Sequence, residues 1–213
     1  MKVHEVKQVQ KRVKRYWYED GIAELISGGM FTLLGLYFGI LTYFGEGSLV
    51  SVILQSSLLL LMIAGAFVVR WLVNTLKERL TYPRTGYVEY RTNDGDARWR
   101  RWVIVGVGMI VASVSILLVR RLHGMDSMAL VTGLLVGVIF ITLRGRSAGL
   151  RRFYVLGGLA IALGLALAFV QLPQTLSLAL FYGLLGFAIL LSGGLVLRRY
   201  LRAHPLPEGN ANG

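Results

Sequence analysis

Residues 48–73 read SLVSVILQSSLLLLMIAGAFVVRWLV, an apolar run in which the first charged residue is Arg70. A helix of about 20 apolar residues is long enough to cross the roughly 30 Å hydrocarbon core of a bilayer. A helix of this length in a soluble protein would keep polar residues along one side, whereas this run has only a few scattered serines and Gln55. The run therefore predicts a transmembrane helix.

The rest of the chain has the same character. Of its 213 residues, 55% are hydrophobic and 16% are charged, against about 45–50% and about 25% in an ordinary soluble domain. The apolar residues gather in blocks of roughly 18–26 residues, each suited to one membrane crossing. We expect an all-α membrane protein with six transmembrane helices, at residues 21–44, 48–73, 102–119, 127–143, 153–170 and 176–196.

The distribution of basic residues predicts the orientation. The chain has 23 Lys and Arg residues and a formal net charge of +12. Only Arg120 and Arg121 fall in an odd-numbered gap between spans; the other basic residues lie near the two termini or in the even-numbered gaps. Because Lys and Arg accumulate in cytoplasmic loops, both termini are expected on the cytoplasmic side of a prokaryotic inner membrane. Nucleic-acid binding is not expected, since it concentrates basic residues on one face of a folded domain.

The spans contain an internal repeat. An offset of 129 residues aligns Gly28-Gly29 with Gly157-Gly158, and the same offset aligns Ser48 with Ser177. A second offset, of 50 residues, aligns residues 177–180 with residues 127–130. The pattern indicates a helical hairpin of about 50 residues used three times, with the copies related by an axis along the membrane normal. The alternative is a chance match between spans built from few residue types.

These hairpins resemble a known family. The form Gly-Gly-x-x-x-x-x-Gly, a short outer loop and then Ser-Leu-Ala-Leu-x-x-Gly-Leu-Leu, complete at residues 177–185, is similar to the short repeats of HdeD-like acid-resistance membrane proteins. The resemblance covers residues 21–197 and implies a six-helix architecture. It brings no catalytic residues with it. The basic N-terminal segment and the long second gap depart from the family pattern.

Two segments outside the spans could act at the cytoplasmic face. Residues 1–20 place valines at three- and four-residue steps opposite Lys and Arg, which indicates a basic amphipathic helix on an anionic leaflet or, alternatively, a basic tail. In the cytoplasmic loop 77–101, Asn93-Asp94-Gly95 is a hairpin turn signal, so we expect a small β-hairpin-like structure. It is either a solvated connector or a docking site for anionic lipid or protein. The candidate docking residues are Tyr87, Tyr90, Arg91, Arg98, Trp99 and Arg100. Residues 198–213 form a cytoplasmic tail.

Polar residues inside spans are functional candidates because they are costly in hydrocarbon. Glu24 lies about one turn inside the first span and Arg70 about one turn from the inner end of the second. We expect them to form an ion pair with Asn74 nearby, although Glu24 could instead bind a proton or a cation. Gln55 is the most central strongly polar side chain and is expected to make an interhelical hydrogen bond.

The motif Gly-x-x-x-Gly, which allows close helix approach, occurs at Gly35–Gly39 and at Gly133–Gly137. It fits packing within one chain or formation of a homo-oligomer. No cysteine is present, and the three histidines are scattered along the chain, so neither a metal site nor a cofactor site is predicted. We also find no catalytic motif, and enzyme activity is not expected.

The sequence favours a non-enzymatic inner-membrane protein that acts as a scaffold or as a stress- or envelope-related sensor at the cytoplasmic face. The alternative is a small transporter or channel with a path near Glu24, Gln55 and Arg70. A cavity lined by polar side chains would favour transport, and a dry, tightly packed centre would favour the scaffold.

Overall fold

The computed structural model describes residues 18–45, 47–82, 127–145, 149–170 and 172–205. These residues are helical or lie in short connections, and none of them forms a strand. The elements are α2 (Ile22–Phe44), α3 (Leu49–Leu80), α6 (Ser127–Ile139), a π-helical turn η1 (Phe140–Gly145), α8 (Arg151–Val170) and α9 (Gln174–Ala203).

Four of these helices, α2, α3, α8 and α9, are long and apolar enough to cross a membrane, and Met128–Thr142 forms a shorter apolar helix. The described helices thus match five of the six predicted spans in position. The predicted span 102–119 and the predicted β-hairpin-like loop lie outside the described residues.

Two helices continue further than predicted. Helix α3 ends at Leu80 instead of residue 73, and α9 ends at Ala203 instead of residue 196. The sequence interpretation ended both spans close to the ends of their apolar runs. The last turns of both helices contain basic residues, Lys77 and Arg79 in α3 and Arg202 in α9, and positive charge is favourable at a helix C-terminus. The helices therefore continue beyond their apolar segments.

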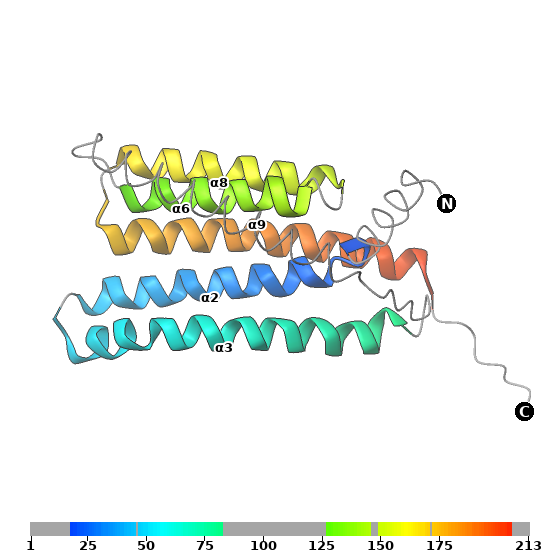
Figure 1. The fold of residues 1–213 in the computed structure, drawn as a ribbon, viewed down its shortest axis with the longest axis horizontal. Coiled ribbons are helices and arrows are strands. Elements are labelled where there is room, and N and C mark those ends of the chain that lie inside the picture. Colours follow the sequence, from blue (N-terminus) through cyan, green and yellow to red (C-terminus); the bar gives the residue numbers. More distant parts are fainter. Residues whose placement is uncertain (1–17, 46, 83–126, 146–148, 171, 206–213) are drawn as a thin grey trace, which may run out of the picture.

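The helices lie side by side, with α9 between α2 and the α6–α8 pair and with α3 on the far side of α2 (Figure 1). Helices α2 and α8 begin at one end of the bundle, where α3 and η1 end and where the C-terminal part of α9 passes. We call this end the polar end, because it holds the ion pairs described below.

Glycines allow α2 and α9 to touch along their backbones. A Cβ atom on Gly28 would lie 2.6 Å from the backbone nitrogen of Leu190, and one on Gly35 would lie 2.6 Å from that of Gly183. On the opposite helix, a Cβ on Gly193 would lie 2.5 Å from the nitrogen of Leu25. Since real Cβ atoms do not approach backbone atoms this closely, only glycine fits at these positions.

The α6–α8 pair is built in the same way. A Cβ on Gly133 would lie 2.7 Å from the Cα of Gly164, and one on Gly137 would lie 2.8 Å from the carbonyl oxygen of Gly157. Both glycines of this predicted Gly-x-x-x-Gly motif therefore pack within one chain. In the other motif Gly35 packs against α9, whereas a Cβ on Gly39 would meet no atom within 4 Å.

The centre of the described bundle is apolar. Phe153, Phe181, Leu185 and Ile189 are fully buried, and they form one cluster with other side chains of α6, η1, α8 and α9. Rings of the cluster meet edge to face or at a tilt, as Phe140 does with Phe153 at a centroid distance of 6.4 Å. Close van der Waals packing of these side chains holds the helices together.

Helix α3 is packed least. It contacts α2 at Gly65, where a Cβ would clash with Met30, and at Leu54, whose carbonyl oxygen accepts a 2.7 Å hydrogen bond from the hydroxyl of Tyr37. Most of its other apolar side chains face outward, and both Leu59 and Leu60 are 73% exposed. An outward apolar surface of this kind suits lipid.

Candidate functional site: a polar network at one end of the bundle

The buried charged residues of the described chain, Asp20, Glu24 and Lys77, all lie at the polar end. Together with Arg152 they form two ion pairs, Asp20–Lys77 and Glu24–Arg152, which involve the helices α2, α3 and α8. A buried charge is stable only when it is paired and hydrogen-bonded, so these contacts explain how the sequence keeps charges inside an apolar bundle.

The first pair joins the start of α2 to the end of α3. Lys77 Nζ lies 2.7 Å from Asp20 Oδ2, and the Thr81 hydroxyl donates a 3.1 Å hydrogen bond to the same oxygen. The other oxygen of Asp20 accepts a hydrogen bond from the backbone N–H of Ile22. Asp20 thus satisfies a free N–H at the helix start, as capping residues do, while it holds the end of α3.

Gly21 makes this arrangement possible. Its φ of 73° lies in the left-handed region that glycine adopts without strain. A Cβ at this position would also lie 2.6 Å from the carbonyl oxygen of Gly193 in α9. The chain therefore turns into α2 in direct contact with α9.

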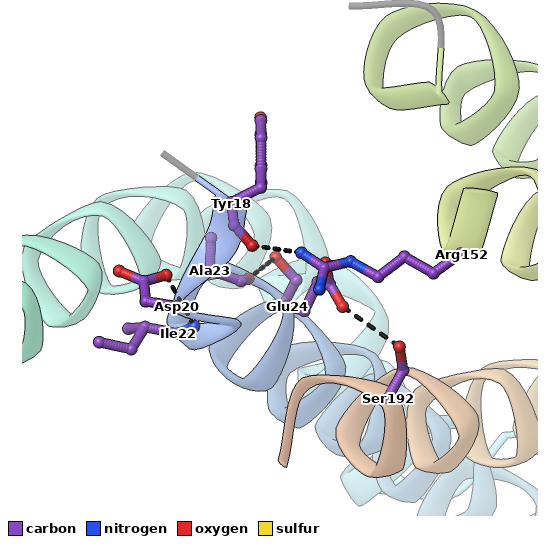
Figure 2. Close-up of polar contacts among 8 residues, drawn as sticks. Tyr18, Asp20, Ile22, Ala23, Glu24, Arg152 and Ser192 are labelled. Atoms are coloured by element: carbon purple, nitrogen blue, oxygen red, sulfur yellow. Dashed lines mark hydrogen bonds and ion pairs between the residues drawn. The ribbon is translucent and has the colours of Figure 1, made fainter. Parts of the chain in front are cut away.

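The second pair joins α2, α8 and α9. Arg152 Nε lies 2.7 Å from Glu24 Oε1, and the Ser192 hydroxyl donates a 3.2 Å hydrogen bond to Glu24 Oε2. Figure 2 shows Arg152 reaching from α8 to Glu24, where it also donates a hydrogen bond to the carbonyl oxygen of Tyr18. The Arg152–Glu24 contact is Coulombic, since neither Nε nor Oε1 has a directed hydrogen-bond partner.

Arg144, at the end of η1, adds a third charge. Its Nη2 atom donates a long, 3.4 Å hydrogen bond to the hydroxyl of Ser27, and its guanidinium lies 5.0 Å from the ring centre of Phe140 and 6.0 Å from that of Phe153. The guanidinium also interacts electrostatically with Glu24. Arg144 therefore lies within electrostatic range of a carboxylate that is already paired with Arg152.

The predicted ion pair between Glu24 and Arg70 is wrong. Glu24 is buried as expected, but its partner is Arg152, and both Arg70 and Asn74 are exposed on α3. The reason is rotation about the helix axis. Gly65 faces α2, and at about 100° per residue Arg70 and Asn74 lie about 140° and 180° around the helix from it.

Gln55 is exposed on α3, and the expected interhelical hydrogen bond is not formed among the described residues. A hydrogen bond between α2 and α3 is made instead by the hydroxyl of Tyr37, which donates to the backbone carbonyl oxygen of Leu54. The candidate docking residues Tyr87, Tyr90, Arg91, Arg98, Trp99 and Arg100, and residues 1–17 of the N-terminal segment, lie outside the described residues.

Sequence reasoning missed most of the network, namely Asp20, Lys77, Arg144, Arg152 and Ser192. The sequence did hold a clue to these contacts. The four charged residues of this set all lie next to predicted spans, at the ends predicted to face the cytoplasm. The interpretation counted Lys77, Arg144 and Arg152 only as basic residues that set the topology, and it gave Asp20 no role. Among the described residues, no three His, Asp or Glu side chains gather as a metal site would require.

No family model, curated protein or solved structure matches this chain. The class of protein follows from the molecule itself: several long apolar helices, packed through glycines around an apolar centre, define an all-helical, multi-pass integral membrane protein.

Proposed function

We propose that this protein is a non-enzymatic scaffold or sensor of a prokaryotic inner membrane, with six spans and both termini in the cytoplasm. The observation that carries the proposal is the separation of polar and apolar groups. The described centre is filled by fully buried Phe, Leu and Ile side chains, and the buried charges are confined to one end.

A transporter needs polar groups near the middle of the membrane. The three residues that could have marked such a path do not come together, because Glu24 is buried at the polar end while Gln55 and Arg70 face outward from α3. The transport alternative therefore loses its candidate site.

The path of the chain supports the sixth span. Residue 82 follows α3 at the polar end, whereas α6 begins at Ser127 at the opposite end, since α6 runs antiparallel to α8 through the contacts Gly133–Gly164 and Gly137–Gly157. The described residues on either side of this interval therefore lie at opposite ends of the bundle. The apolar block 102–119 is the segment suited to a crossing between them.

Matching contacts support the proposed repeat. Gly35 packs against Ala179 and Gly183, and Gly164 packs against Ala129 and Gly133. The offset of 129 relates Gly35 to Gly164. The offset of 50 relates the residues they pack against, Ala129 to Ala179 and Gly133 to Gly183. The HdeD-like resemblance remains a proposal about architecture and about a stress- or envelope-related role.

The function is tested by reconstitution into liposomes. We expect the purified protein to leave proton and K⁺ permeability at the level of protein-free vesicles, with Glu24→Gln giving the same result. A flux that the protein adds and that Glu24→Gln removes would contradict the scaffold and restore the transport alternative.

Action at the cytoplasmic face has its own test. A peptide of residues 77–101 should bind anionic liposomes, and changing Arg91, Arg98 and Arg100 to Glu should weaken that binding. Equal binding of both peptides would remove lipid docking by this loop from the proposal.

A further inference from the structure

The charges around Glu24 do not balance. Arg144 and Arg152 both interact with this carboxylate, whereas Asp20 is already paired with Lys77. Among the described residues, the group formed by Glu24, Arg144 and Arg152 therefore has one excess positive charge in a largely buried setting. A buried charge without a counter-charge is unfavourable, which points to an anion at this place.

The unsatisfied charge lies on Arg144. Its Nη1 atom is buried and has no hydrogen-bond partner among the described residues. Within the same part of the chain, its Nη2 atom makes only the long, 3.4 Å bond to Ser27. Arg152, by contrast, binds both Glu24 and the carbonyl oxygen of Tyr18. The guanidinium of Arg144 can therefore donate further hydrogen bonds, and its side chain is partly exposed.

The local backbone also sets Arg144 apart. It lies in the π-helical turn that follows α6, and single π-helical turns inside helices occur frequently at functional sites. The rings of Phe140 and Phe153 flank the guanidinium and hold it at the helix end, where a membrane helix meets the lipid headgroups.

We propose that Arg144 binds a phosphate group at the polar end of the bundle. The planar guanidinium can donate two parallel hydrogen bonds to phosphate oxygens, and the phosphodiester of an anionic phospholipid is the phosphate found at that depth. Free inorganic phosphate has the same chemistry and is the other possible source. This inference does not depend on the proposed scaffold function.

The test measures lipid binding to the full-length protein in neutral detergent by native mass spectrometry, with phosphatidylglycerol and phosphatidylcholine as probes. The wild type should prefer phosphatidylglycerol, and Arg144→Gln should weaken its binding by about tenfold, the effect of losing a charge-assisted hydrogen bond. Arg70→Gln is the matched control, because it removes the same charge from an exposed position on α3, and it should leave the preference unchanged.

Thermal unfolding in inorganic phosphate without added lipid distinguishes the two sources. Stabilisation of the wild type but not of Arg144→Gln would assign free phosphate, and an effect of phosphatidylglycerol alone would assign the headgroup. If Arg144→Gln does not fold, Arg144→Lys should fold and bind phosphate more weakly. Lysine keeps the positive charge but cannot donate two parallel hydrogen bonds from a planar guanidinium. A wild type with neither a phosphatidylglycerol preference nor a phosphate effect, or equal losses in Arg144→Gln and Arg70→Gln, would overturn the proposal.

Discussion

Glu24 is 1% exposed and is held by Arg152 from α8 and Ser192 from α9. A carboxylate in this position joins α2 to α8 and α9, which are far from it in sequence. Removing one partner of a buried ion pair leaves an uncompensated charge, which is more costly than the pair itself was favourable. The network therefore gives the helices one defined arrangement as well as some stability.

The first prediction concerns this pair. Glu24→Ala and Arg152→Ala should each destabilise the protein by about 3–5 kcal/mol, because each removes one partner of this ion pair. The double variant should lose clearly less than the sum of the two single effects. Thermal or denaturant unfolding in detergent measures the three variants. Strictly additive losses would show that the two side chains are not coupled.

Arg70 is the control at the same scale. Because it is exposed on α3, Arg70→Ala should change stability by no more than about 0.5 kcal/mol. A loss as large as that of Arg152→Ala would mean that Arg70 has a buried partner, as the sequence interpretation had expected.

At the scale of the element, glycine decides how closely α2 can approach α9. Gly28 and Gly29 are neighbours in one helix, yet a Cβ on Gly28 would lie 2.6 Å from the backbone of Leu190, whereas one on Gly29 would meet no atom within 4 Å. The two residues thus separate the packing role of glycine from its low helix propensity.

The second prediction uses that difference. Gly28→Ala should destabilise the protein because α9 must move away, whereas Gly29→Ala should be neutral or stabilising by up to about 1 kcal/mol, the propensity difference between the two residues. Unfolding temperatures of the two variants in one detergent check this. Equal effects would contradict the close α2–α9 contact.

The α6–α8 pair allows the same comparison with Gly164 and Gly158. A Cβ on Gly164 would lie 2.8 Å from both Gly133 and Ala129, whereas one on Gly158 would meet nothing within 4 Å. Gly164→Ala should therefore be the more destabilising change, measured again by unfolding temperature. The reverse order would rule out the packing described for this pair.

The helices could be predicted from the sequence because hydrophobic runs and their lengths report directly on the membrane. The start of α2 was placed within one residue, at 21 against Ile22. Helix rotation could not be predicted. A span that is apolar on every side gives no signal for which face meets a neighbour, so nothing in the sequence showed that Arg70 and Gln55 face outward while Lys77 reaches Asp20.

At the scale of the whole molecule, the sequence predicted that Glu24 would be buried but not which residue would pair with it. Its partner Arg152 is 128 positions away in the sequence, and the two meet only because α2 and α8 begin at the same end of the bundle, on either side of α9. Contacts between helices of different hairpins are set by the packing order. That order depends on small steric differences between glycine and larger residues, which composition does not reveal.

The central claim is a bundle that spans the membrane with its basic end in the cytoplasm. The most direct test is to find on which side of the membrane the end of α3 and the start of α6 lie. The chain has no cysteine, so Arg79→Cys at the end of α3 and Met128→Cys at the start of α6 each introduce one reactive thiol at an exposed position. A membrane-impermeant maleimide applied to intact spheroplasts should label Met128→Cys at once and Arg79→Cys only after permeabilisation. Labelling of both positions from the same side would contradict a membrane crossing between α3 and α6, and the reverse pattern would contradict the orientation.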